Sequence, residues 1–316
     1  MGARLALTPG DPRGIGPEVA RKGLAHLSKT LPDADIVVFG PNGPLPHEAL
    51  ETFEAQGQKR SRDGLWAADI AASSIESAVE AALAGEIQGI ITSPLHKPSL
   101  RLSGRVFPGQ TEMIASLANT DQVGMLMAAE TTRLGAPLRV LLGTTHIRLR
   151  SVPDEVTTEL LVHQSTLLHT ALVDDWGITD PSLGMCALNP HASDGGLFGD
   201  EEQYIYGPAL ESLNASGVKV TGPLPADTVF MRALSGEFDA VIAPYHDVGM
   251  AAFKTVSFGT GVNVTLGLPF IRTSPDHGTA FDISGSDEAD PTSMIKALTL
   301  AHRLASNRFD TPSTDV

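Results

Sequence analysis

Cysteine is almost absent from this chain: Cys186 is the only one among 316 residues. A single thiol cannot form an intramolecular disulfide, so no disulfide framework holds the fold together. Cys186 lies in an apolar run with no evident thiolate-stabilising group nearby, and we therefore expect a buried structural thiol rather than a nucleophile. So low a cysteine content also fits a reducing compartment.

Basic residues are scarce as well, with 22 lysines and arginines against 37 acidic residues and a net charge of −15. This balance disfavours a nucleic-acid-binding surface, because phosphate backbones are bound by clustered cations. A local basic pocket for a small anionic molecule remains open.

Long apolar runs are missing too. No stretch approaches the roughly 18 residues that span a bilayer, and the N-terminal residues lack the apolar core of a signal peptide. We predict a soluble, cytoplasmic protein that binds neither nucleic acid nor membranes.

Short apolar runs alternate with longer amphipathic stretches, a pattern typical of βα units and a parallel sheet. The length of 316 residues allows two domains, or one large α/β domain with an elaborated second half. Strands are expected at 36–39, 89–92, 138–142, 184–188, 240–243 and 261–266, and helices at 17–27, 74–84, 155–172, 201–215 and 291–305. No internal repeat or low-complexity linker marks a domain boundary.

Three histidines, His146, His191 and His246, each lie in a cluster of small and polar residues that follows an apolar run of strand length. Parallel sheets bind ligands outside the carboxyl ends of their strands, so three imidazoles there could hold one divalent metal with an open coordination position. Separations of 45 and 55 residues are too long for a local metal motif, however. A hydrogen-bonded loop residue remains the alternative for each histidine.

The glycine-rich loop Gly10–Gly16 precedes a helix N-terminus, where free N–H groups attract anions. It matches neither the dinucleotide-binding nor the P-loop pattern, so a structural turn and a site element both remain open. Lys254 and Arg272 lie in apolar surroundings where a cation needs a partner. Either a structural salt bridge or an anionic substrate would supply it. The loop Asp276–Ile283 carries further ionisable groups, or is simply a turn before the last helix.

Taken together, these segments resemble the 4-hydroxythreonine-4-phosphate dehydrogenase family. The matching segments, in the family's order, are Thr8–Asp11, Gly14–Glu18, Leu188–Ala192, Gly222–Thr228, Tyr245–Asp247, Asn263–Ser274 and Asp276–Ala280. The resemblance implies two α/β/α lobes with a cleft between them, similar to isocitrate and isopropylmalate dehydrogenases, in a homodimer. We expect residues 1–125 and 275–316 to form the first lobe, and residues 126–274 to form the second, with the histidines.

The resemblance also implies roles for individual residues. His146, His191 and His246 would bind a divalent metal (zinc, cobalt, magnesium or manganese), with one of them donated across the dimer interface. The substrate-binding residues would be Gln110, Thr111, Asp227, Lys254, Asn263 and Arg272, of which Lys254 and Asp227 are candidates for a catalytic role. The residues expected to contact the cofactor, NAD or NADP, are His277, Gly278 and Asp282.

The implied reaction is the oxidation and decarboxylation of 4-phosphohydroxy-L-threonine to 3-amino-2-oxopropyl phosphate, a step towards pyridoxal phosphate. Three features depart from the family pattern: Gln110 replaces the usual histidine, the region 39–74 is short, and Gly285–Glu288 is acidic where a basic residue is common. The same scaffold could therefore act on D-threonate or D-erythronate 4-phosphate, or on an aromatic cis-dihydrodiol carboxylate. A non-catalytic metal- or anion-binding protein is the alternative of another class.

Overall fold

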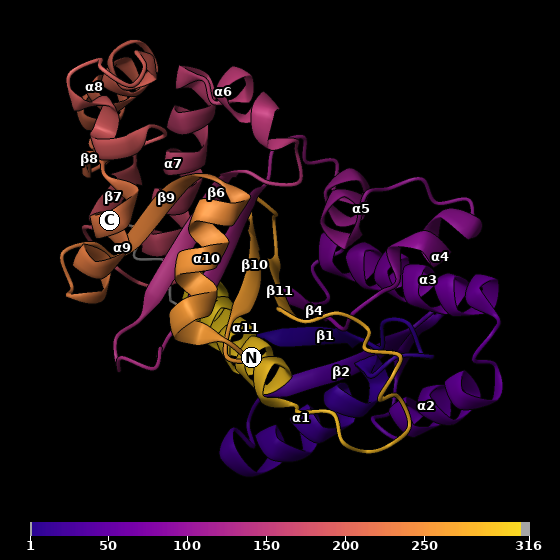
Figure 1. Ribbon diagram of the computed structural model, residues 1–316. Coiled ribbons are helices and arrows are strands. Elements are labelled where there is room, and N and C mark those ends of the chain that lie inside the picture. Colours follow the sequence, from indigo (N-terminus) through magenta and orange to yellow (C-terminus); the bar gives the residue numbers. More distant parts are fainter. Residues whose placement is uncertain (1, 311–316) are drawn as a thin grey trace. The chain divides into compact units, whose positions relative to one another are not determined.

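A computed structural model describes residues 2–310 of the chain, which form two compact units (Figure 1). Unit 1 contains residues 2–123 and 262–310, and unit 2 contains residues 124–261. Each unit has its own strands, helices and buried apolar core. The two α/β units that the sequence predicts are therefore present.

The sheet of unit 1 has the strand order β3-β2-β1-β4-β11-β10. Strands β2, β1, β4 and β11 run parallel, whereas β3 and β10 pair antiparallel with β2 and β11. The strands are β1 (Arg4–Thr8), β2 (Asp35–Gly40), β3 (Gly43–Leu45), β4 (Gly89–Thr92), β10 (Val262–Leu266) and β11 (Ile271–Pro275). The parallel pairing places the ends of β1 and β4, Thr8 and Thr92, side by side at one sheet edge.

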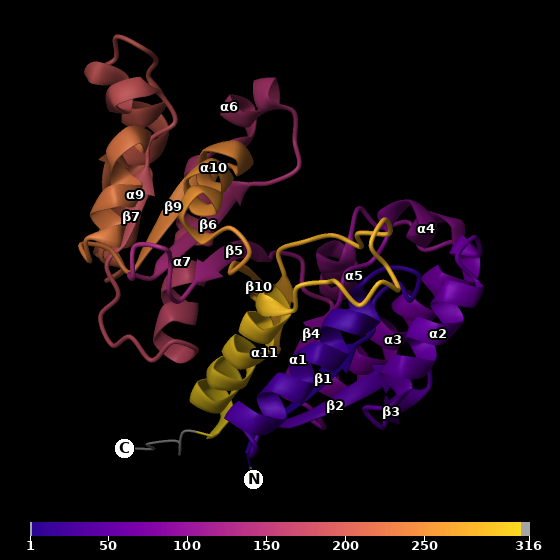
Figure 2. The same cartoon turned by 60° about the horizontal axis from the view of Figure 1, so that its bottom comes forward.

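Helices cover both faces of this sheet. The helices are α1 (Gly16–Thr30), α2 (Ala49–Lys59), α3 (Gly64–Leu83), α4 (Lys97–Leu102), α5 (Gln110–Leu117) and α11 (Thr292–Ala305), followed by the π-helical turn η4 (Ser306–Asp310). Helix α11 packs on β4, β10 and β11 and lies beside α1, as Figures 1 and 2 show, whereas α3 packs on β1, β2 and β4. The result is an α/β/α sandwich.

Helix α3 is longer than the sequence pattern predicts, because it begins at Gly64 rather than at Ser74. Asp63 caps it by accepting a hydrogen bond from the N–H of Trp66 at 3.0 Å. Its buried face is rich in alanine, including Ala68 and Ala72, which lets the helix approach the sheet closely.

The sheet of unit 2 has the strand order β5-β6-β9-β7-β8, with only β5 antiparallel to its neighbour. The elements are β5 (Gly124–Ala129), β6 (Leu138–Thr144), η1 (Leu149–Ser151), α6 (Val152–Glu155), α7 (Thr158–Asp174), β7 (Leu183–Cys186), η2 (Pro190–Asp194), η3 (Glu202–Tyr206), α8 (Gly207–Ala215), β8 (Val220–Leu224), α9 (Ala226–Leu234), β9 (Ala240–Tyr245) and α10 (His246–Ser257). Helix α7 packs on β5 and β6, while α9 and α10 pack on β6 and β9.

The second predicted domain boundary differs from the observed one. The prediction placed residues 262–274 in the second lobe, whereas they belong to unit 1. Strands β10 and β11 form an antiparallel pair, and β11 also pairs with β4, so this segment is tied to the first sheet by backbone hydrogen bonds.

Cys186 is 1% exposed at the end of β7, and burial raises the pKa of its thiol to about 12. It is therefore the buried structural thiol that the sequence predicts, and its raised pKa keeps it protonated at neutral pH. Across residues 2–310, no helix is long and apolar enough to cross a membrane.

Candidate active site

His146 and His246 lie close together in unit 2. Strands β6 and β9 are parallel neighbours whose last residues, Thr144 and Tyr245, are paired in register. His146 follows β6 and His246 opens α10 directly after β9, so both rings emerge at the same sheet edge, with centroids 5.6 Å apart. A cavity of about 240 Å³ beside them is lined by Thr145, His146, Ile147, Leu149, Val152, Tyr245, His246 and Asp247.

The ring of His246 is oriented by its neighbour. Nδ1 of His246 lies 2.7 Å from Oδ1 of Asp247. A carboxylate beside Nδ1 favours the tautomer with the proton on that nitrogen, which leaves Nε2 free to accept a proton or bind a metal. Such a carboxylate–histidine pair is common behind metal-ligating imidazoles.

His191 does not join this pair within the chain. It follows β7, the neighbour of β9 in the sheet, but lies exposed in the turn Pro190–Asp194. Among residues 2–310, no group of three or more histidine, cysteine, aspartate or glutamate side chains is placed to hold a metal ion. The structure therefore brings together two of the three predicted ligands.

The turn that carries His191 has an unusual backbone. His191, Ala192, Ser193 and Asp194 have φ angles of 54°, 53°, 72° and 46°. Four successive left-handed residues with a Cβ are sterically unfavourable, so surrounding contacts must hold them. The sequence pattern gave no indication of this conformation.

The two paired imidazoles fit part of a metal site. Neutral imidazole nitrogens suit zinc and cobalt, whereas magnesium prefers oxygen ligands. A catalytic zinc site uses three protein ligands and an open position, so His146 and His246 require one further ligand.

Arg272 is a buried charged residue of unit 1. It lies in β11, is 3% exposed, and donates hydrogen bonds to neutral oxygens alone. Its acceptors are Oγ1 of Thr92 (2.9 Å), Thr265 (3.0 Å) and Thr111 (3.3 Å), and Oε1 of Gln110 (3.3 Å). Its Nε is buried without a hydrogen-bond partner among the described residues.

This environment is costly for a cation. Burial lowers the pKa of Arg272 to about 10, and the charge of Glu112 only partly opposes that shift. Arg272 thus remains charged at neutral pH without an ion pair among residues 2–310. A buried cation without a counter-ion is typical of a site that binds an anion.

Gln110 and Asn263 lie around this guanidinium. The Gln110 amide donates to the carbonyl of Ser93 at 2.9 Å while its oxygen faces Arg272. Asn263 lies two residues before Thr265 on β10, hence on the same strand face, and its Oδ1 is buried without a partner in the described chain. The predicted residues Gln110, Thr111, Asn263 and Arg272 are therefore assembled in one unit.

Lys254 and Asp227 belong to unit 2, with the histidines. Lys254 lies on α10, eight residues after His246 and so about 12 Å along the helix. Its Nζ lies 5.7 Å from the ring centroid of Phe258. Asp227 is exposed in the first turn of α9.

The predicted cofactor residues lie in the loop between β11 and α11. His277 is partly buried, with Nε2 lacking a partner, while Gly278 and Asp282 are exposed. This loop contacts the glycine-rich loop, because the N–H of Ile15 donates to the carbonyl of Thr279 at 2.9 Å. A Cβ on Gly14 would lie 2.5 Å from that carbonyl oxygen, which explains a glycine there.

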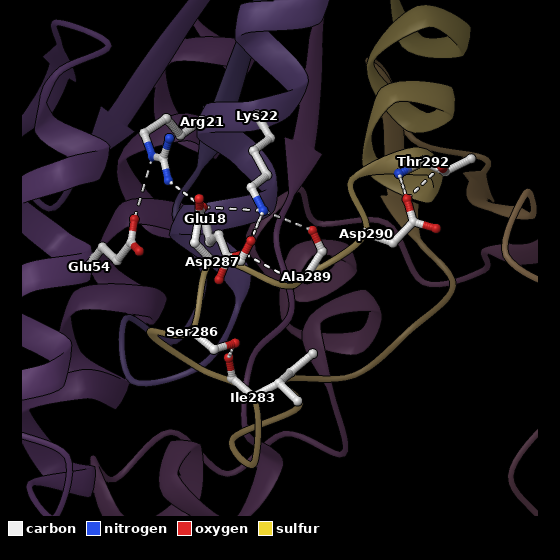
Figure 3. Close-up of polar contacts among 10 residues, drawn as sticks. All are labelled: Glu18, Arg21, Lys22, Glu54, Ile283, Ser286, Asp287, Ala289, Asp290 and Thr292. Carbon is white, nitrogen blue, oxygen red and sulfur yellow. Dashed lines mark hydrogen bonds and ion pairs between the residues drawn. The ribbon is translucent and has the colours of Figure 1, made fainter.

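A clamp on α1 holds the far end of this loop, as Figure 3 shows. Nζ of Lys22 donates to Glu18 (2.8 Å) and to the carbonyls of Asp287 (2.7 Å) and Ala289 (3.2 Å), and forms an ion pair with the Asp287 side chain (3.2 Å). Arg21 also pairs with Asp287 at 3.2 Å. This clamp was not predicted from the sequence, although the Glu18–Lys22 spacing of four residues was a visible signal.

Comparisons with known proteins show the family of this chain. The family model described as pyridoxal phosphate biosynthetic protein PdxA matches residues 40–301. A curated 4-hydroxythreonine-4-phosphate dehydrogenase from Chromobacterium violaceum is 38% identical over 95% of this chain and 96% of its own length. The crystal structure of the enzyme of that name from Klebsiella pneumoniae is 36% identical with a TM-score of 0.83, covering 96% of this chain and 98% of that one.

More distant proteins also share this fold. A β-decarboxylating dehydrogenase from Thermococcus kodakarensis shares the fold at 14% identity and a TM-score of 0.54, over 94% of this chain and 82% of that one. The predicted fold class, two α/β/α lobes, is confirmed, and the β-decarboxylating dehydrogenase shares that fold. Because its relatives at 36–38% identity are dehydrogenases, the protein is an oxidoreductase with this two-lobed fold. More narrowly, it belongs to the pyridoxal phosphate biosynthetic protein PdxA family, as the sequence motifs predict.

Proposed function

We propose that this protein is a metal-dependent nicotinamide dehydrogenase that oxidises and decarboxylates 4-phosphohydroxy-L-threonine to 3-amino-2-oxopropyl phosphate, in pyridoxal phosphate biosynthesis. The name of its curated relatives supports the substrate. The single observation that carries the proposal is the buried guanidinium of Arg272, which has only neutral hydrogen-bond acceptors and so calls for an anionic ligand.

Residues of unit 1 bind and orient the substrate in this proposal. Arg272 grips an anionic group of the substrate, while Thr111 and Gln110 fix the guanidinium. The unpartnered Oδ1 of Asn263 accepts a hydrogen bond from a substrate hydroxyl or ammonium group. Burial around Arg272 strengthens these contacts, because the local dielectric is low.

Residues of unit 2 hold the metal and move the proton. His146 and His246 bind the ion through imidazole nitrogens, and Asp247 holds the ring of His246 in the required tautomer. Lys254 and Asp227 are the candidates to receive the proton of the substrate hydroxyl. When bound, a divalent ion polarises the hydroxyl oxygen and the nicotinamide accepts the hydride.

We further propose a homodimer in which His191 of each subunit completes the metal site of the other. The proposal is supported by the closeness of His146 to His246, the exposure of His191, and the need for a third ligand. Leu197 and Phe198, 71% and 47% exposed in the loop after His191, supply apolar surface for such an interface.

The cofactor in this proposal is NAD rather than NADP, bound along His277, Gly278 and Asp282. The cations of α1 beside this loop, Arg21 and Lys22, are already paired with carboxylates. The loop itself adds negative charge, which opposes a second phosphate on the ribose. The cytoplasmic location stays a prediction.

The test is a substrate panel assayed at the nicotinamide absorbance. The purified protein is given 4-phosphohydroxy-L-threonine, D-threonate 4-phosphate, D-erythronate 4-phosphate and a cis-dihydrodiol carboxylate, each with NAD⁺ and NADP⁺. The highest kcat/KM is expected for 4-phosphohydroxy-L-threonine with NAD⁺, with CO₂ released in equal amount to NADH. No turnover on any member would instead favour a non-catalytic anion-binding protein.

A further inference from the structure

Glu202 is a buried carboxylate whose hydrogen bonds all go to one short segment. It is 6% exposed and is the first residue of the π-helical turn Glu202–Tyr206. Its Oε1 accepts from the backbone N–H groups of Leu188 (3.0 Å) and Asn189 (2.7 Å), and its Oε2 accepts from Nδ2 of Asn189 (2.9 Å). Glu202 thus fixes the chain where it leaves β7, two residues before His191.

The segment held in this way is the left-handed turn described above. Its four residues have φ angles between 46° and 72°, which are unfavourable for residues with a Cβ. Ser193 closes the other end, because its hydroxyl donates to the carbonyl of Gly199 and accepts from the N–H of Gly196 at 3.0 Å. Without the anchor at Glu202, the turn would relax to more favourable angles and His191 would point elsewhere.

We propose that Glu202 is the positioning residue that presents His191 to the metal site. The inference rests on the proposed function, in which His191 is the third metal ligand. A turn that is already ordered lowers the entropic cost of metal binding. Glu202 therefore raises the metal affinity through His191, a residue to which it is not hydrogen-bonded. The carboxylate accepts all three hydrogen bonds, whereas a glutamine has a single acceptor oxygen and would turn its NH₂ group towards at least one of the three donors.

The neighbouring carboxylate supplies a matched control. Oε2 of Glu201 accepts only from Nδ2 of Asn189, at 2.7 Å, and is not hydrogen-bonded to the backbone of residues 188 and 189. Glu201→Gln and Glu202→Gln therefore remove the same charge from adjacent positions. The two variants differ in how many hydrogen bonds from residues 188 and 189 the replaced carboxylate accepts, three for Glu202 and one for Glu201.

The experiment titrates the full-length, metal-free protein with Co²⁺, following the visible absorption bands of the bound ion and the heat of binding. Glu202→Gln is expected to weaken Co²⁺ binding roughly 10–100-fold, the range for groups that orient metal ligands, and to change the band pattern. Glu201→Gln is expected to stay within about threefold of wild type. Equal affinities for the two variants would overturn the inference.

A second variant guards against a Glu202→Gln protein that fails to fold. Ala192→Gly removes the Cβ at a φ of 53°, so the left-handed angle becomes favourable and the turn depends less on its anchor. Ala192→Gly alone is expected to keep the wild-type melting temperature and Co²⁺ affinity. The protein that carries both Ala192→Gly and Glu202→Gln is expected to fold and to bind Co²⁺ more weakly than Ala192→Gly alone. Equal Co²⁺ affinities of these two proteins would overturn the inference.

His191→Ala separates this inference from the proposed function. Loss of Co²⁺ in His191→Ala with unaltered affinity in Glu202→Gln would reject the role of Glu202 and leave the metal site standing. A wild-type protein that binds no Co²⁺, or a His191→Ala protein that binds it fully, would reject the metal site and this inference with it.

Discussion

The guanidinium of Arg272 and the amide oxygen of Gln110, 162 residues apart in sequence, are hydrogen-bonded at 3.3 Å. The same amide donates to the carbonyl of Ser93, so its orientation is fixed from both sides. A neutral acceptor therefore occupies a position where a carboxylate would have neutralised Arg272. Because Gln110 is neutral, the positive charge of Arg272 stays available for an anionic ligand.

The first prediction concerns Arg272→Met. We expect kcat/KM to fall by an amount equivalent to about 1.5–3 kcal/mol of transition-state stabilisation, the scale of a hydrogen bond to a charged group. The melting temperature should stay equal or rise. The folded-state pKa of about 10 lies below the ordinary 12.5, so folding disfavours the cation at neutral pH. That unfavourable contribution disappears only as the pH rises through 10 towards 12.5, and methionine removes it at every pH.

Arg139→Met is the matched control, because Arg139 is buried as well but is paired with Glu130 through contacts of 3.0 and 3.1 Å. Its loss is expected to cost stability, about 3 kcal/mol, with kcat/KM unchanged. If Arg272→Met behaved as Arg139→Met, with lower stability and full activity, Arg272 would be a structural residue.

The second prediction tests which subunit supplies His191. His191→Ala and His246→Ala homodimers should each be inactive. Mixed dimers should recover activity, because the subunit carrying His191→Ala retains His146 and His246 and receives an intact His191 from its partner. Random mixing makes half the dimers mixed, each with one complete site of two, so about a quarter of wild-type activity is expected. No recovery in verified mixed dimers would place all three ligands in one chain.

The third prediction concerns the clamp on α1. Lys22→Met should raise KM for NAD⁺ about 10–150-fold, the scale of one hydrogen bond to a charged group, with kcat nearly unchanged, because the loop is no longer held in place. Lys29→Met, a change of the same charge at the exposed end of the same helix, should leave KM unaltered. Equal KM values in both variants would mean that the clamp serves only the fold.

The pH dependence of the clamp follows from the lysine. The hydrogen bond from Lys22 to Glu18 raises the pKa of Lys22 above its ordinary 10.5. A raised pKa means that the stabilisation is fully present below pH 10.5 and is lost as the pH rises through the folded-state value. KM for NAD⁺ in the wild-type protein should therefore show no contribution from this group between pH 6 and pH 9.

Much of the fold could be predicted from the sequence, since strands buried on both faces give continuous apolar runs. The runs at 89–92, 138–142 and 240–243 are confirmed as β4, β6 and β9. Strand β5 was missed, although Gly124–Ala129 is an apolar run and Gly135 and Pro137 in its connection to the antiparallel neighbour β6 were turn signals. The start of α3 was also missed: the helix begins ten residues earlier than predicted, after the N-cap residue Asp63.

The candidate site, like the fold, could be predicted only in part. Motifs located Arg272, Gln110, Thr111 and Asn263, and the parallel register of β6 and β9 explains why His146 and His246 meet. No pattern could show that His191 is turned away, because its left-handed backbone depends on Glu202, eleven residues later in the chain. The metal and cofactor roles of these residues remain predictions.

The last prediction is that Gln110 tunes the choice of substrate and is not required for turnover. The amide is a neutral acceptor for Arg272, and the hydride and metal chemistry lies on other residues. In Gln110→His, an imidazole would stand beside the guanidinium. An unperturbed histidine begins to protonate near pH 6.5, and the adjacent Arg272 opposes its protonation, so a second positive charge appears only below about pH 6.5.

That added charge favours substrates with more negative charge at this position. We expect the kcat/KM ratios among the phosphorylated four-carbon acids to change up to about fivefold below pH 6.5, equivalent to about 1 kcal/mol, and to change little at pH 8. The measurement is the ranking of the substrate panel at pH 6 and pH 8 for both proteins. A wild-type protein inactive on every substrate, with activity restored by Gln110→His, would show that the histidine is indispensable to the reaction. A ranking that is the same in both proteins at both pH values would make position 110 irrelevant to specificity, and Arg272 with its threonine partners would then set it alone.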